Sequence, residues 1–233
     1  MPGPNGTDAD AKEIAYRRIR LLTGPRSMIE SNPNAAQRGG AKSDGFIYQM
    51  DARVLGEGKT VIDSRGVYFL STDREEEAWI LRTALRSASK SEPQVGSELG
   101  ARTGTSMAIT TEATGQGVMN HKPIIQSDGY ISQVEVALLP WLLIKNDVQT
   151  EHGFYTWRSG EDRIMLRKDI VEKIADQGWK ISTQVAEGRP PQITYYDAKG
   201  NMIRSEMSDG SVWEPTTLQE LMRIWESKGL PTK

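Results

Sequence analysis

Few residues of this chain have the types and the spacing that an active site requires. Its two histidines, His121 and His152, lie in polar or glycine-flanked surroundings. Neither has a cysteine, an aspartate or a second histidine at helical or hairpin spacing, so we expect no metal site and two surface or hydrogen-bonding histidines. The chain contains no cysteine, which excludes disulfides, thiolate metal ligands and cysteine nucleophiles.

Two groups of carboxylates could support an enzymatic interpretation. Glu75, Glu76 and Glu77 open a predicted helix, where acidic residues are favoured by the helix dipole alone. Asp128 and Glu135 lie around a predicted strand, and a hydrolase would need two such carboxylates to converge. Nothing in the sequence brings them together, so a hydrolase stays an alternative. We expect no enzyme, no catalytic residue and no cofactor.

The only candidate element for contact with nucleic acid is a predicted amphipathic helix over residues 8–23. Its polar face carries Arg17, Arg18 and Arg20. Cations on one helix face can neutralise several phosphates, so a nucleic-acid-binding accessory protein is the alternative function. A phosphate loop is not indicated, because Gly100–Gly104 lacks a Gly-Lys-Ser/Thr sequence and a strong preceding strand.

Six tryptophans stand out in a chain whose aromatic content is only 7%. Trp141 and Trp157 lie with Tyr155 in a mid-chain segment that is predicted to form sheet. Large amphipathic aromatics are enriched in protein interfaces as well as in cores. We predict that Trp141, Trp157 and Tyr155 help to bind a partner protein, and that the other tryptophans belong to the core.

The composition predicts a modest core and much irregular backbone. Apolar residues make up 37% of the chain and its mean hydropathy is −0.53, whereas roughly 45–50% is usual for a globular domain. A net charge of −2 creates no global field to attract a polyanion. The longest apolar run, from Val136 to Ile144, is interrupted by Pro140 and is too short to cross a bilayer, so no membrane partner is expected.

Local signals predict an α+β fold, with a small mixed or antiparallel β-sheet body, three to four helices and long extended arms. Capping residues predict helices over residues 72–88, 169–176 and 217–229. Alternating apolar residues predict a strand from Tyr130 to Leu139, and the glycine-containing loop Asp197–Asn201 predicts a hairpin.

Two stretches without periodicity are interpreted as arms that neighbouring molecules hold in place. The predicted organisation is an N-terminal helix and extended arm over residues 1–44, a β-hairpin plus capped helix over 45–88, an extended arm over 89–127 and an α+β domain over 128–233. Within the second arm, only Met107–Thr111 is a candidate for a short strand.

The segment from Gly66 to Arg82 resembles a pattern found in small structural proteins of tailed bacteriophages. In that pattern a strand ending in Gly-x-Tyr-x-Thr precedes an aspartate, further acidic residues and a helix with an aromatic-Leu-Arg sequence. The present chain has Asp73-Arg74 where the pattern has Asp-Pro, and its strand is one residue longer. The resemblance implies a role in a virion.

These features together predict a non-enzymatic structural component of a multi-subunit assembly, namely a phage virion protein of the capsid, neck or tail. Its partners would be other protein subunits of the same assembly, in homo- and hetero-oligomers, bound through the arms and the aromatic anchors. Its location would be the virion, assembled in the host cytoplasm, with a cytoplasmic location as the alternative.

Overall fold

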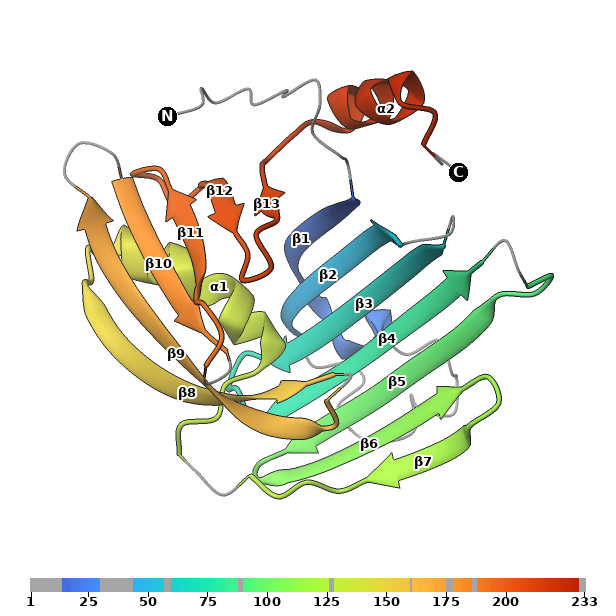
Figure 1. Cartoon of the computed structure of the whole chain (residues 1–233). Coiled ribbons are helices and arrows are strands. Elements are labelled where there is room, and N and C mark those ends of the chain that lie inside the picture. The colour runs from blue at the N-terminus through green and yellow to red at the C-terminus, as the bar shows by residue number, and fades with distance from the viewer. Residues whose placement is uncertain are drawn as a thin grey trace. The chain divides into compact units, whose positions relative to one another are not determined.

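Two antiparallel sheets dominate the structure, which is a computed structural model (Figure 1). Its described residues fall into two compact units. One unit contains residues 14–138 and 155–165, and the other contains residues 139–154 and 166–230. The parts of the chain that the structure describes are residues 14–29, 44–56, 60–87, 90–125, 128–159, 161–174, 178–185 and 188–230.

The first unit is built on a seven-stranded meander in which each strand pairs with the next one along the chain. A short 3-10 helix, η1 (Arg26–Met28), follows the first strand. The strands are β1 (Ala15–Pro25), β2 (Asp44–Leu55), β3 (Val61–Ser71), β4 (Glu76–Arg86), β5 (Gln94–Thr103), β6 (Ser106–Ala113) and β7 (Gly117–His121).

The register of this sheet separates its side chains into two faces. Tyr68 of β3 lies opposite Trp79 of β4, so both point to the same side, which we call the tryptophan face. Arg65 and Phe69 alternate with Tyr68 along the strand and point to the other side, as does Arg82, the cross-strand partner of Arg65. We call that side the arginine face.

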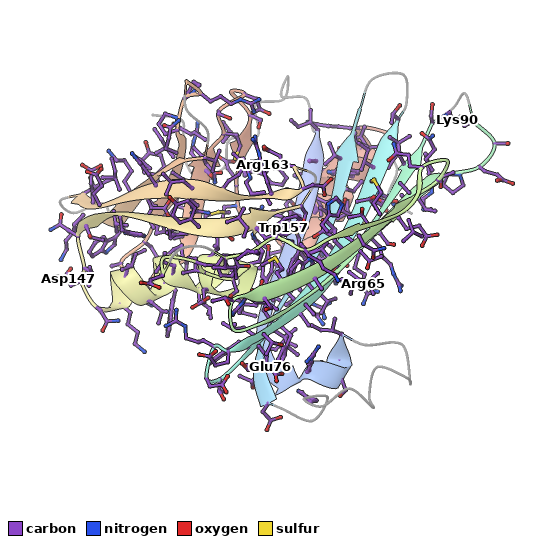
Figure 2. The ribbon with its side chains drawn as sticks, turned by 90° about the horizontal axis from the view of Figure 1, so that it is seen from below. Arg65, Glu76, Lys90, Asp147, Trp157 and Arg163 are labelled. Carbon is purple, nitrogen blue, oxygen red and sulfur yellow. The ribbon has the colours of Figure 1, made fainter. Side chains whose placement is uncertain are left out.

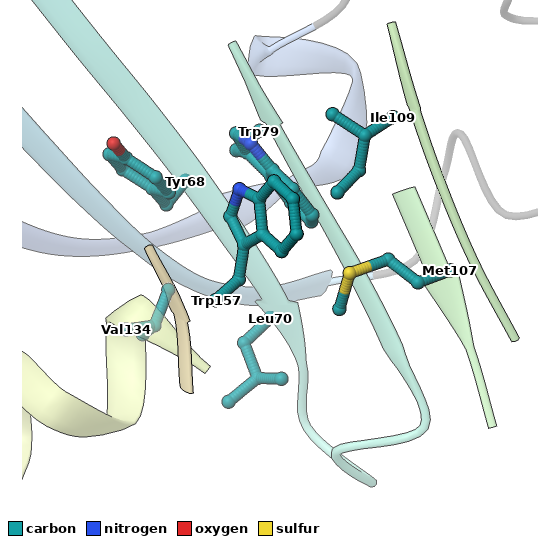
Figure 3. Packing of buried hydrophobic residues seen from close by; sticks show 7 residues of the cluster. All are labelled: Tyr68, Leu70, Trp79, Met107, Ile109, Val134 and Trp157. Carbon is teal, nitrogen blue, oxygen red and sulfur yellow. The ribbon is translucent and has the colours of Figure 1, made fainter. Parts of the chain in front are cut away.

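The tryptophan face carries the larger buried cluster (Figure 3). Trp157 comes from β8 (Thr150–Arg158), Val134 comes from α1 (Gln133–Lys145), and both pack against the sheet. The side chains that the sheet contributes are Tyr68, Leu70, Trp79, Met107 and Ile109. A smaller cluster on the arginine face contains Ile29, Ile47, Val67, Phe69 and Ala78.

The second sheet is also a meander, with the order β13-β12-β11-β10-β9-β8. Its core, with Ile144 from α1, contains Val171, Trp179 and Ile181. Besides β8, its strands are β9 (Arg163–Ile174), β10 (Gly178–Gln184), β11 (Gln192–Tyr196), β12 (Met202–Glu206) and β13 (Val212–Trp213). The predicted hairpin around Asp197–Asn201 is confirmed as the β11–β12 connection.

The predicted C-terminal helix is confirmed as α2 (Leu218–Ser227). Thr217 caps it, since its hydroxyl oxygen accepts a hydrogen bond from the backbone N–H of Glu220. This is the capping arrangement that the sequence indicates.

The predicted α+β class with three to four helices is wrong. The described residues contain only two α-helices, and most of the other ordered segments are strands. The predicted helix over residues 72–88 is strand β4, because the polar residues before it close a tight turn rather than a helix N-terminus. In that turn Ser71 Oγ accepts from the Glu76 N–H, and Arg74 adopts a φ of 66°. The predicted helix over residues 169–176 belongs largely to β9, and residues 175–177 lie outside the described part.

The predicted strand from Tyr130 to Leu139 is mostly helix α1. Ser132 and Glu135 form a capping box there: the Glu135 N–H donates to Ser132 Oγ, and the Ser132 N–H donates to Glu135 Oε2. Pro140 lies inside the helix. A Ser-x-x-Glu signal was present in the sequence, but the apolar alternation after it favoured a strand.

The predicted arm over residues 89–127 is wrong for its described part, because it forms β5, β6 and β7 of the sheet. The candidate strand Met107–Thr111 is confirmed within β6. The predicted helix over residues 8–23 is strand β1 from Ala15 onward. Residues 8–13 of that helix and residues 30–43 of the first predicted arm lie outside the described part of the chain.

Candidate functional site

The buried carboxyl group of Glu98 accepts hydrogen bonds from several side chains on the tryptophan face. Glu98, on β5, is only 5% exposed, and its Oε1 accepts three hydrogen bonds. The donors are Trp79 Nε1 at 2.6 Å, Trp157 Nε1 at 2.9 Å and Ser159 Oγ at 2.8 Å. Because an indole N–H can only donate, two buried tryptophans need such an acceptor. Glu98 therefore connects β4, β5 and the end of β8.

A second buried group of charges lies on the same face. Glu77 accepts from Arg102 Nε at 3.0 Å and from the Tyr130 hydroxyl at 3.0 Å. The other Arg102 nitrogens donate to the carbonyl oxygens of Arg74 and Gly104. Burial raises the pKa of Glu77 to about 7, although the Arg102 guanidinium acts in the opposite direction. These groups satisfy one another, which indicates a structural role.

The arginine face carries an open hollow of about 860 Å³. A cross-strand row of small residues exposes its backbone along the floor of this hollow, comprising Ala52, Ser64, Thr83, Gly96 and Ala113. The charged side chains that line it on the arginine face include Asp51, Asp63, Arg65, Arg82 and Glu112.

Arg65 and Arg82 lie directly opposite each other in this hollow, on β3 and β4. The side chain of Arg65, labelled in Figure 2, is 74% exposed, and Arg82 is also exposed. Asp51 is shared, with Arg18 Nη2 at 2.6 Å and Arg65 Nε at 3.8 Å. The side chain of Arg82 has no ion pair or hydrogen bond with any residue in the described ranges. The lining of the hollow thus includes two arginines and three carboxylates, and the Arg82 guanidinium is not paired with any of these carboxylates.

Asp63, one of the carboxylates that line the hollow, forms ion pairs with arginines other than Arg82. Arg53 Nε donates to Asp63 Oδ1 at 2.6 Å, and Arg86 contacts the other carboxylate oxygen. The hydrogen bond from Arg53, followed by that from Arg86, holds the pKa of Asp63 below its usual value. Asp63 therefore pairs with Arg53 and Arg86 and not with Arg82.

The three aromatic residues predicted to bind a partner have different environments. Trp157 is 1% exposed and belongs to the core, so a role as a surface anchor is wrong for it. Tyr155 is 38% exposed. Trp141, on α1, is 43% exposed, and Lys145 Nζ lies 4.5 Å from its ring centroid. Trp141 belongs to the unit of residues 139–154 and 166–230, whereas Trp157 belongs to the buried cluster of the other unit.

The three predicted nucleic-acid arginines do not share one face. They lie on strand β1, where Arg18 and Arg20 point to the arginine face and Arg17 points to the tryptophan face. Arg18 is also paired with Asp51. The helix on which the nucleic-acid hypothesis depended is therefore absent from the described residues of this segment.

Three further residues could take part in catalysis or metal binding, and each has its own local contacts. His121 Nε2 lies 3.5 Å from Thr111 Oγ1, and His152 stacks against the Phe154 ring. Glu135 caps α1 and pairs with Arg74, so its carboxylate has a structural use. Among the described residues, no three His, Asp or Glu side chains are grouped so that they could hold a metal ion.

Sequence reasoning missed both Glu98 and the Arg65–Arg82 pair. The arginines are 17 positions apart, and only the register of β3 against β4 makes them neighbours. Glu98 stands in a polar stretch without periodicity, and its tryptophan donors come from 19 and 59 positions away.

Comparisons with known proteins add little to this geometry. No protein-family model matches the chain, and no curated protein matches it. Among solved structures, it is similar to a beta-barrel-like protein of domain of unknown function DUF1849 from Brucella abortus. The TM-score is 0.46 and the identity 11%, with 81% of this chain and 89% of that chain covered. In the described part of the chain, no helix has the length and apolar character to span a membrane.

Proposed function

We propose that this chain is a non-enzymatic binding protein, and that Arg65 and Arg82 bind an anionic group of its ligand, a carboxylate or a phosphate. The observation that carries the proposal is the direct cross-strand pairing of these two exposed arginines within a hollow. Like charges directly opposite each other destabilise a sheet pair, so an anion that bridges them removes an existing repulsion.

The chemistry of the guanidinium group supports this assignment. Each guanidinium is planar and presents its N–H donors in a fork that matches two oxygens of a carboxylate or phosphate. The hydroxyl-bearing side chains of Tyr16 and Ser97, which point to the arginine face, also line the hollow. An oxyanion between Arg65 and Arg82 would therefore meet donors from β3 and β4, with hydroxyl groups nearby.

Binding fits these residues better than catalysis does. A guanidinium stays charged at any physiological pH, so neither arginine can accept or deliver a proton in a reaction. The expectation that the chain is not an enzyme remains a prediction. So does the virion-assembly interpretation, for which an acidic side chain of a neighbouring subunit would be one source of the anion.

Calorimetric titration with inorganic pyrophosphate and, separately, with citrate tests the proposal. We expect the wild-type chain to bind at least one of them saturably, and we expect Arg82→Gln to weaken that binding at least tenfold. Arg20→Gln is the matched control, since Arg20 is an exposed arginine of the same face outside the hollow. The two probes distinguish phosphate from carboxylate.

Two outcomes would contradict the proposal. One is the absence of saturable binding of both probes to the wild-type chain. The other is equal weakening by Arg82→Gln and Arg20→Gln, which would indicate a diffuse effect of charge rather than a site. Because binding to arginine pairs is electrostatic, the affinity should also fall as salt is raised from 50 to roughly 300 mM.

A further inference from the structure

A smaller pocket, of about 230 Å³, lies beside Glu98 on the tryptophan face. We infer that it binds the ammonium group of a small organic amine, with Glu98 Oε2 as the acceptor. This inference is independent of the anion site, because it uses other side chains on the opposite face of the sheet. The side chains that define it are Leu81, Thr83, Glu98, Thr111, Met119 and Asp162.

The two oxygens of Glu98 are used very differently. Oε1 accepts from the two tryptophans and from Ser159, whereas Oε2 has no hydrogen-bond partner among the residues that the structure describes. Only 5% of Glu98 is exposed, and Oε2 is not among the fully buried side-chain atoms that lack a partner. The pocket beside it offers the place from which a donor could reach Oε2.

The Trp79 and Trp157 indoles also fix the direction of the carboxyl group. Three donors at Oε1 prevent the group from rotating freely, so Oε2 keeps one orientation before any ligand arrives. A preorganised acceptor binds more tightly, because less conformational freedom is lost on binding. Glu98 thus combines a structural bond network with an oriented acceptor.

The polar lining of the pocket favours a cation over an anion. Asp162, in the turn between β8 and β9, supplies a second carboxyl group, and no arginine or lysine is among the residues that line this pocket. Thr83 and Thr111 supply hydroxyl groups that can accept further hydrogen bonds. A primary ammonium group has three donors and would match these acceptors.

The apolar lining and the size limit the rest of the ligand. Leu81, Ala113 and Met119 provide an apolar surface, and Met119 is 43% exposed. The volume corresponds to roughly eight water molecules at about 30 Å³ each. A short aliphatic or single-ring amine fits this volume, whereas a folded partner does not.

The test uses n-butylammonium chloride as the probe and the indole N–H signals of the chain in a two-dimensional NMR spectrum. We expect saturable shifts of the Trp79 and Trp157 indole signals, since both N–H groups donate to the same carboxyl group. Sodium butyrate has the same alkyl chain with the opposite charge, and it should cause no such shifts.

Glu98→Gln provides the decisive variant. Its amide oxygen can still accept from the indoles, while its NH₂ group replaces the acceptor that faces the pocket. We expect at least a tenfold loss of affinity for butylammonium. Glu92→Gln is the matched control, because Glu92 is exposed and is not among the residues that line this pocket. This control should bind as the wild type does.

A second variant covers the case in which Glu98→Gln fails to fold. Ala113→Leu fills the pocket without altering any donor to Glu98, so it should abolish butylammonium binding and leave the indole signals of the free chain in place. Arg82→Gln should bind the amine normally, which separates this site from the proposed anion site. Unsaturable shifts in the wild type, or full affinity in either pocket variant, would overturn the inference.

Discussion

The two faces of the seven-stranded sheet differ in the burial and pairing of their charged side chains. On the tryptophan face, Glu77 and Glu98 are almost completely buried, and each is held by several donors. On the arginine face, Arg65 and Arg82 are exposed, and the guanidinium group of Arg82 has no hydrogen-bond or ion-pair partner in the described residues. Buried charges must be paired to be tolerated, whereas exposed charges can remain unpaired because water solvates them.

This difference separates most of the stabilising contacts from the proposed anion site. The tryptophan face stabilises the sheet through apolar burial and satisfied polar groups, so its substitutions should cost free energy of unfolding. The arginine face has its charges in a solvent-accessible hollow, so its substitutions should change binding more than stability. The predictions that follow test this separation.

The largest effect is expected for Trp157→Ala. The substitution removes a side chain that is 1% exposed and one of three donors to Glu98, and it should lower the free energy of unfolding by about 3–5 kcal/mol. Urea unfolding measures this change. Arg65→Ala, its counterpart on the arginine face, should change stability by less than about 0.5 kcal/mol. Similar losses in the two variants would contradict the comparison.

The second effect concerns pH and Glu77. Its pKa is about 7 in the folded chain and near the ordinary value of 4.5 in the unfolded chain. Between these values the unfolded chain binds fewer protons, so the free energy of unfolding falls as the pH rises from about 4.5 to about 7. The contribution is on the order of 3 kcal/mol and is constant on either side of this window.

Glu77→Gln should remove that part of the pH dependence. Urea unfolding at several pH values between 4 and roughly 8 would measure the slope for the variant and the wild type. Glu75→Gln is the control, since Glu75 is exposed and should leave the slope unchanged. Parallel curves for Glu77→Gln and the wild type would show that Glu77 does not titrate in this window.

A smaller effect is expected for Gly100→Ala on β5. A Cβ at this position would lie 2.0 Å from Cζ2 of the Trp79 ring, so the indole could not keep its place across the strand. Such overpacking should cost about 1–3 kcal/mol. Gly96→Ala is the control on the same strand, because its nearest contact is the Thr83 hydroxyl at 3.0 Å. Thermal unfolding of the two variants should therefore rank Gly100→Ala as the less stable.

The smallest effect is expected for Arg82→Glu on the arginine face. It replaces a like-charge pair with Arg65 by an opposite-charge pair, which should raise the free energy of unfolding by about 0.2–1 kcal/mol at low salt. Denaturant unfolding at low and high salt measures this gain, which salt should reduce. A clear loss of stability would mean that Arg82 has a structural role that the comparison does not give it.

Parts of this fold could be predicted from local patterns. The α2 helix and the β11–β12 hairpin follow from signals within a few residues, Thr217 to Glu220 in one case and Asp197–Asn201 in the other. Their hydrogen bonds lie within the same short segments, so tertiary contacts were not needed to choose them. The absence of cysteine likewise excluded disulfides from the sequence alone.

Other local signals were ambiguous, and the sheet decided them. The acidic residues before β4 can cap a helix or close a turn. The alternate residues Glu77, Trp79 and Leu81 lie on one face of the sheet, as the period of a strand requires. Strand pairing with β3 and β5 on both sides satisfies the backbone of this segment. An isolated segment has no such partners, so its propensity favoured a helix.

The sequence by itself determined the chain's low apolar content, its lack of cysteine and its locally closed elements. Only the tertiary structure decided that residues 94–121 form three strands, because Glu98 and Arg102 take core positions and hide the apolar alternation. A buried charge is stable only beside its partners, and Trp157 and Glu77 reach these two residues only after folding. Register alone likewise placed Arg65 opposite Arg82.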